Sequence, residues 1–155
     1  EFYTGNADGA SSTNKMTITS AGDIYGTAWT DYSNHSTIVG WSSYTDKVIL
    51  FKRIGKFIYV YARIGGSADT SSGVASFTVP STCKNTTDYY ACVNMNWGTD
   101  NGSSQDFGLT ANHVRAYLQY NTGVVHLARG ASNSGWTASG TKFIQCDLVY
   151  EAESI

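Results

Sequence analysis

Two tryptophans and their polar neighbours are the residues of this sequence whose types and spacing best suit ligand binding. Trp97 and Trp136 stand at the edges of segments rich in Gly, Ser, Asn and Asp, and Asp100 and Asn101 follow Trp97 closely. Sugar rings stack on indole faces through C–H contacts, while amide and carboxylate groups hydrogen-bond to sugar hydroxyls. Aromatic anchors with a few polar groups make a typical binding site. We therefore expect a ligand-binding surface at Trp97, Asp100, Asn101 and Trp136.

Two adjacent tyrosines extend this aromatic set. Tyr89 and Tyr90 follow a Thr-Thr-Asp turn, so one of the pair should face solvent and reach a ligand. The alternative is that Trp97 and Trp136 pack in the core, since tryptophans are highly buried on average. The sequence leaves both readings open for the tryptophans.

Catalytic constellations are weak in this chain. A glycosidase needs two facing carboxylates, and the only pair in one loop is Asp100 and Asp106, which suit turn capping or ligand contact better. His35, His113 and His126 are scattered, without the close pairing of a metal site, and no Gly-x-Ser-x-Gly elbow or phosphate-binding glycine motif occurs. We expect no enzymatic activity, no metal and no cofactor.

The composition favours a small, weakly charged domain. The chain has 155 residues, which suits one domain, and charged residues make up 14% against about 25% in an average soluble domain. The net charge is −2, and Lys and Arg form no stripe, so nucleic-acid binding has little support. No apolar run approaches the ~20 residues of a membrane-spanning helix. A surface of hydroxyls and amides suits a neutral glycan, although any soluble β-protein can have one.

The cysteines point to a reducing site of assembly. An odd count of three, Cys83, Cys92 and Cys146, argues against a fully paired disulfide framework. Cys83 and Cys92 are close enough in sequence to bridge. Buried free thiols are the favoured state, and they fit folding in a cytosol.

Short β-rich runs separated by Gly, Ser and Asn clusters predict an antiparallel β-sandwich. The clearest element is a hairpin, with strands at 48–53 and 56–64. Further strands are expected at 15–20, 75–79, 91–97, 107–110, 114–120, 123–128 and 142–150. Glycine-rich loops are expected at 65–73, 98–106 and 130–140, and these carry most of the candidate binding residues.

The second strand of the hairpin is apolar on both faces. Because side chains alternate along a strand, one face presents Phe57, Tyr59 and Tyr61 and the other Ile58, Val60 and Ala62. One face should pack on the second sheet, and a neighbouring subunit is the expected cover of the other. Residues 1–40 are poorer in aliphatic residues and are expected to run as an extended segment along such a neighbour, with the sandwich at 41–155.

A series of short motifs, in a fixed order, resembles the C-terminal receptor-binding or head domains of bacteriophage tail fibres and related virion appendages. The motifs span about residues 36–151 and are Gly40-Trp41-Ser42-Ser43-Tyr44-Thr45, Phe51-Lys52-Arg53-Ile54-Gly55-Lys56, Ile64-Gly65-Gly66-Ser67-Ala68, Phe77-Thr78-Val79-Pro80, Trp136-Thr137-Ala138-Ser139-Gly140-Thr141-Lys142 and Val149-Tyr150-Glu151.

This resemblance implies a jelly-roll-like sandwich that forms a homotrimer at the distal end of a virion fibre. It implies assembly in the host cytoplasm and attachment to a bacterial surface glycan or protein, and the chain would be the C-terminal part of a longer protein. The loops of that family vary, so it supplies no ligand residues. Two alternatives stay open: a monomeric carbohydrate-binding module or lectin domain, and a purely structural trimeric virion domain. An enzyme is the least favoured reading.

Overall fold

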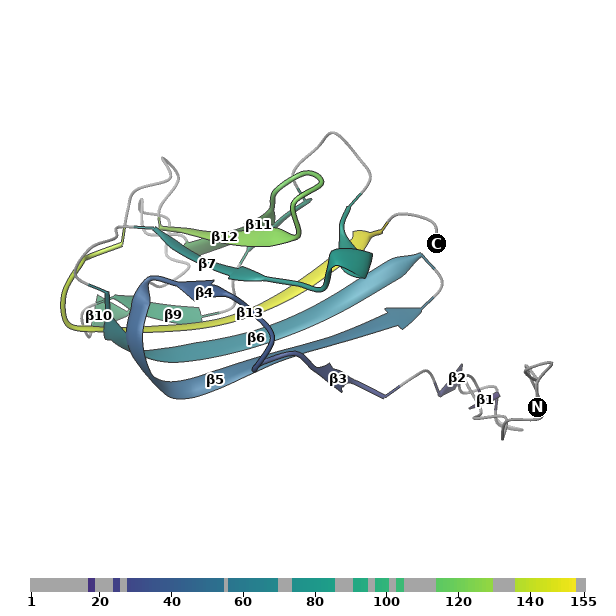
Figure 1. The fold of residues 1–155 in the computed structure, drawn as a ribbon, viewed down its shortest axis with the longest axis horizontal. Coiled ribbons are helices and arrows are strands. Elements are labelled where there is room, and N and C mark those ends of the chain that lie inside the picture. The colour runs from purple at the N-terminus through teal and green to yellow at the C-terminus, as the bar shows by residue number, and fades with distance from the viewer. Residues whose placement is uncertain are drawn as a thin grey trace.

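Two antiparallel sheets packed face to face make up the fold in the computed structural model (Figure 1). The structure describes residues 17–18, 24–25, 28–54, 56–69, 74–85, 91–94, 97–100, 103–104, 114–129 and 136–152. The prediction of an antiparallel all-β sandwich is confirmed. Among the described residues, no helix has the length and apolar character needed to cross a membrane.

The larger sheet has six strands in the order β10-β9-β13-β6-β5-β3. Their bounds are Ser103–Ser104 for β10, Trp97–Asp100 for β9, Thr141–Glu151 for β13, Phe57–Ala68 for β6, Trp41–Ile54 for β5 and Thr30–Asp31 for β3. The long strands β5, β6 and β13 run side by side along the whole length of the layer (Figure 1). This places β6 in the middle of the sheet, as its apolar sequence predicts.

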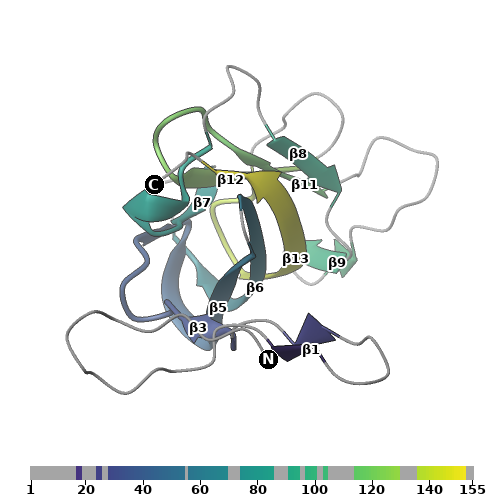
Figure 2. The same cartoon turned by 90° about the vertical axis from the view of Figure 1, so that its right-hand side faces the viewer.

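The smaller sheet has five strands in the order β4-β7-β12-β11-β8 and covers one face of the larger (Figure 2). Its bounds are Ile38–Val39 for β4, Ala75–Thr78 for β7, Val124–Arg129 for β12, Val114–Leu118 for β11 and Ala91–Asn94 for β8. A 3-10 helix, Ser81–Cys83, follows β7, and a separate pair joins β1, Thr17–Ile18, to β2, Ile24–Tyr25.

The core lies between the two sheets. Strand β6 contributes Ile58, Val60, Ala62 and Ile64, all at most 1% exposed. Alternate residues of β13 and of the opposite sheet complete the cluster, among them Ile144, Cys146, Leu148, Phe77, Leu118 and Val125. The predicted alternation of β6 is therefore confirmed on its inner side.

Strands β6 and β9 extend into glycine-rich segments that were expected to be loops. The prediction of a loop at 65–73 is wrong for residues 65–68, which continue β6, and the loop predicted at 98–106 begins with the end of β9. At Gly66 the sheet is bulged, with φ +153°, and a Cβ there would lie 1.9 Å from the carbonyl oxygen of Ser43. Only glycine fits so close an approach, so this glycine belongs to a strand rather than a loop.

Residues before Gly40 contribute to both sheets. Strand β3 pairs with β5, and β4 pairs with β7. The amide of Tyr32 donates to the carbonyl of Ile49 at 2.8 Å. Residues 30–39 are thus part of the sandwich, which begins before the boundary expected at Gly40. Two-residue strands carry too little alternation to be recognised in sequence.

Candidate functional site

Asp100 is a buried side chain at one end of the sandwich. Only 2% of it is exposed. Its Oδ2 accepts hydrogen bonds from the amide and the hydroxyl of Thr137, both at 3.0 Å. The structure therefore joins the predicted loop at 98–106 to the one at 130–140, but through an internal bond rather than an open ligand contact.

Trp136 is a core residue. Its side chain is 4% exposed, and its indole N–H donates to the carbonyl of Leu127 at 2.7 Å. A stacking role needs an exposed ring face, so the expectation that Trp136 contacts ligand is corrected here. The open alternative, that this tryptophan packs in the core, is the one the structure favours.

Several other predicted residues lie beyond what the structure describes. Asn101, Tyr89 and Tyr90 fall outside the described residues, as do Asp106 and His113. For Trp97 the backbone is placed: it is the first residue of β9 and pairs with Gln145 of β13. These residues stay sequence-based predictions.

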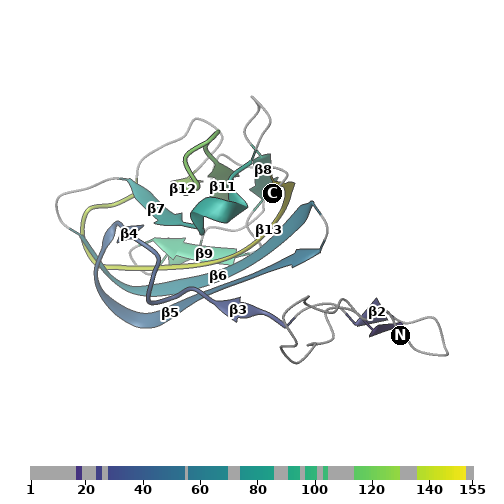
Figure 3. The same cartoon turned by 45° about the vertical axis from the view of Figure 1, so that its right-hand side comes forward.

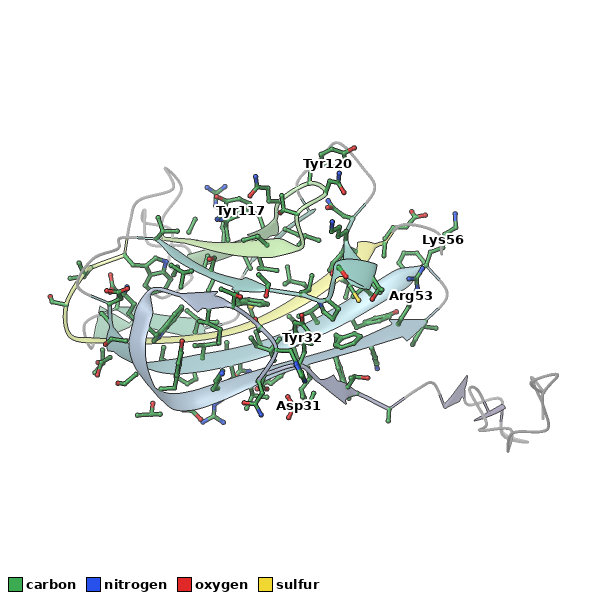
Figure 4. The ribbon with its side chains drawn as sticks, viewed as in Figure 1. Asp31, Tyr32, Arg53, Lys56, Tyr117 and Tyr120 are labelled. Carbon is green, nitrogen blue, oxygen red and sulfur yellow. The ribbon has the colours of Figure 1, made fainter. Side chains whose placement is uncertain are left out.

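The outer face of the six-stranded sheet carries several exposed apolar side chains and a depression. It faces away from the smaller sheet, on the lower side of the molecule as seen in Figure 3. In Figure 4, Arg53 and Lys56 are labelled at the hairpin end of the molecule, and Tyr117 and Tyr120 are labelled on the layer of the smaller sheet. The outer face changes character between its two ends.

The hairpin end of this face is apolar and half-exposed. Phe57 and Val149 are each 52% exposed, Ile54 is 40% exposed and Trp29 is 44% exposed. They surround Tyr59, which pairs with Val149 on one side and with Lys52 on the other. The Lys52 ammonium lies 4.7 Å from the ring centroid of Trp29 and 5.2 Å from that of Tyr59, a cation–π arrangement. We call these residues the apolar end.

The opposite end of the face carries a shallow depression of about 180 Å³. Most of the lining residues are glycines or carry a hydroxyl group, and the other two are a phenylalanine and a lysine. The lining consists of Thr45, Gly65, Gly66, Ser67, Thr99, Thr141, Lys142 and Phe143. The first predicted loop supplies residues 65–67, the second supplies Thr99, and Thr141 directly follows the third. Parts of the first two predicted loops therefore meet at this depression, beside the residue that follows the third.

Three unlike groups converge above Gly65. A Cβ placed on this glycine would lie 2.9 Å from Cδ2 of Phe143, 3.3 Å from Oγ1 of Thr45 and 3.5 Å from Oδ2 of Asp46. The absent side chain thus lets an aromatic ring, a hydroxyl and a carboxylate approach one another on the sheet surface. Sequence alternation places Phe143 on the opposite face of β13 from Ile144, but it gives no sign that the ring borders a depression.

An ion pair borders the same place. Arg63 Nη2 lies 2.9 Å from Asp46 Oδ1, and the guanidinium carbon lies 5.6 Å from the ring centroid of Phe143. The positive charge of Arg63 is therefore already matched. Lys142 is only 1% exposed, and its ammonium donates inward to the carbonyl of Gly40 at 3.1 Å. The depression accordingly presents neutral hydrogen-bonding groups rather than a free charge.

The cysteines whose side chains the structure describes are buried thiols. Cys83 and Cys146 are free and buried, which confirms the expected state for these two; the side chain of Cys92 is not among those described. Burial raises the pKa of the Cys146 thiol to about 12 and also raises the pKa of Cys83. Within the described ranges, no three His, Cys, Asp or Glu side chains gather into a possible metal site.

Neither a scan against models of known protein families nor a search among curated proteins finds a match to this sequence.

Proposed function

We propose that this chain is the receptor-binding tip domain of a bacteriophage tail fibre or a related virion appendage. In this proposal the chain forms a homotrimer and attaches the virion to a bacterial surface receptor, with a glycan as the favoured ligand. Assembly takes place in the host cytoplasm, which fits the free thiols of Cys83 and Cys146.

The observation that carries the proposal is the divided outer face of the six-stranded sheet. One sheet face is covered by the smaller sheet, and the other leaves Phe57 and Val149 half-exposed while a polar depression occupies its far end. Apolar clusters of this kind on a soluble protein mark interaction sites. One surface thus has separate regions for a subunit contact and for a ligand.

A second copy of this chain is the proposed cover of the apolar end. The surface around it carries both signs of charge, with Lys52 inside it and the Lys56–Glu151 pair, 3.5 Å apart, at its edge. In a ring of three copies each subunit meets its neighbour through two different patches, and a surface with both signs of charge can supply an opposite charge to either one. Three copies would also present three depressions to one cell surface, which raises avidity without new contacts.

A matched pair of substitutions tests the subunit contact. Val149→Lys introduces charge at the apolar end, and Val74→Lys makes the same change at a residue of nearly equal exposure, 55% against 52%, just before β7 of the other sheet. Light scattering coupled to size exclusion should give a trimer for the wild type and for Val74→Lys, and a smaller species for Val149→Lys. Loss of assembly in both variants, or in neither, contradicts the proposed contact.

Attachment is tested with the labelled wild-type domain on a panel of bacterial strains and on a glycan array. Saturable adsorption by a trimer supports the proposal. Glycan binding by a clean monomer favours the carbohydrate-binding-module alternative instead. A stable trimer that adsorbs to no cell and no glycan favours a structural virion domain.

A further inference from the structure

We infer that the depression at Gly65 and Gly66 binds a single neutral pyranose ring. This inference rests on the proposed function, because it names the ligand class and the place of contact for a glycan-binding tip. The sequence alone pointed to the tryptophans of the loops, whereas the geometry points to hydroxyls and one phenylalanine on the strands beside them.

The size of the depression limits the ligand. At about 180 Å³ it is smaller than the roughly 300–1,000 Å³ pockets of drug-sized molecules. A single ring fits, and the remainder of a glycan would extend over the open sheet surface. This matches recognition of a terminal or branching residue in a longer polysaccharide.

The polar lining has unused hydrogen-bonding capacity. Within the described part of the chain, the side-chain hydroxyls of Thr45, Ser67, Thr99 and Thr141 form no hydrogen bond to another protein group. Each hydroxyl can donate one bond and accept two. Four of them around one depression can exchange hydrogen bonds with the ring hydroxyls of a sugar, which are donors and acceptors of the same kind.

The apolar contact comes from Phe143. The Cδ2 atom of its ring lies 2.9 Å from the position that a Cβ of Gly65 would take, and the side chain is only partly buried. Pyranose rings have a C–H face that packs on aromatic carbon, while their hydroxyls point to the side. The threonine hydroxyls border the same depression as this ring, so one ligand can contact both.

Charge selects a neutral ligand over an acidic one. Arg63 is paired with Asp46 at 2.9 Å, and Lys142 directs its ammonium to Gly40 inside the sandwich. An acidic sugar would bring an unmatched carboxylate beside Asp46 and lose hydration without gaining a free cation. We therefore expect neutral hexopyranosides to bind more tightly than glucuronic acid.

The first experiment is an NMR titration of the full chain with methyl α-glucoside, methyl α-galactoside, methyl α-mannoside and glucuronic acid. At least one neutral glycoside should bind, and glucuronic acid should bind more weakly than the best neutral sugar. Tighter binding of glucuronic acid, or binding of none of the four, overturns the inference.

The second experiment locates the site with near-isosteric variants. Thr99→Val and Thr141→Val remove one hydroxyl each, and each should weaken the best neutral glycoside by roughly three- to tenfold. Phe143→Ala should weaken it further. Thr30→Val, on β3 of the same sheet and outside the depression, is the matched control and should bind as the wild type does. Unchanged melting temperatures show that the valine variants are folded.

Cell adsorption separates this inference from the function on which it rests. If the wild-type trimer adsorbs to cells and the depression variants adsorb equally well, the site is wrong and the tip function stands. If the wild type neither assembles nor adsorbs, the proposed function fails whatever the sugar titration gives. Loss of both sugar binding and adsorption in Thr99→Val and Thr141→Val, but not in Thr30→Val, supports both.

Discussion

Lys142 of β13 and Asp100 of β9 are directly paired across two neighbouring strands, and their side chains are 1% and 2% exposed. Burial lowers the pKa of the Lys142 amine, and the negative charges of Asp100 and Asp69 act in the opposite direction. A buried charge is costly unless other groups compensate it. The pairing therefore explains how an acidic and a basic side chain can both be buried at the depression end of the sandwich.

Asp100→Asn should destabilise the fold by about 1.5–3 kcal/mol, because it removes the charge that compensates Lys142 and weakens the bonds from Thr137. Urea denaturation measures the loss. Glu151→Gln, at the exposed end of β13 where the ion pair with Lys56 is open to solvent, should change stability by no more than about 1 kcal/mol. Adding Lys142→Met to Asp100→Asn should cost less than the sum of the single changes. Strict additivity would show that the two side chains are not coupled.

Trp136→Phe should lower the free energy of unfolding by about 1–3 kcal/mol, since it leaves the buried Leu127 carbonyl without the indole donor. Sugar affinity should stay at the wild-type value, because this side chain is in the core. Tyr120→Phe, at a residue 42% exposed and outside the apolar end, serves as the stability control. A selective loss of sugar binding in Trp136→Phe, with stability intact, would restore the original expectation of a ligand-stacking tryptophan.

Cys83 and Cys146 should resist thiol reagents in the native protein. Both are buried, and raised pKa values keep them protonated at pH 8, where the reactive thiolate is scarce. Peptide mapping after brief labelling should find neither residue modified, whereas labelling in denaturant should modify both. Rapid native labelling of Cys146 would mean that the core opens far more readily than its packing indicates.

Acidification should destabilise the fold through His126. Burial lowers the pKa of this imidazole from its ordinary 6.5, and its Nε2 lies 2.8 Å from Oε1 of Gln119. Below pH 6.5 the unfolded chain binds a proton that the folded chain does not, so stability falls as the pH drops from 6.5 through the lower folded pKa. Urea midpoints between pH 7.5 and 5.5 measure this slope. The substitution His126→Gln should reduce the dependence of the urea midpoint on pH. An unchanged dependence would show that another group causes the destabilisation.

The hairpin strands and the alternation of β6 were predictable because they depend on local chemistry. Ile58, Val60 and Ala62 share one side of the strand by geometry alone, and their apolar character requires that this side be buried. The three glycine-rich segments were also recognisable. Their structural role was not predictable, because glycine serves both loops and close strand contacts. Gly66 pairs with Tyr44 between two register shifts, and its close approach to the Ser43 carbonyl requires a glycine within the strand.

The sequence by itself determined that this chain is an antiparallel β-sandwich with a central strand that is apolar on both sides, and it favoured free thiols without excluding a bridge between Cys83 and Cys92. Only the tertiary structure decided which aromatic residues are available to a ligand. Trp136 is inside because its N–H reaches the Leu127 carbonyl, and Phe143 borders a depression because Gly65 on the neighbouring strand leaves room beside it. Phe143 and Gly65 are far apart in sequence, and Trp136 reaches Leu127 only through the folded path of the chain between them, so the local sequence pattern does not contain either contact.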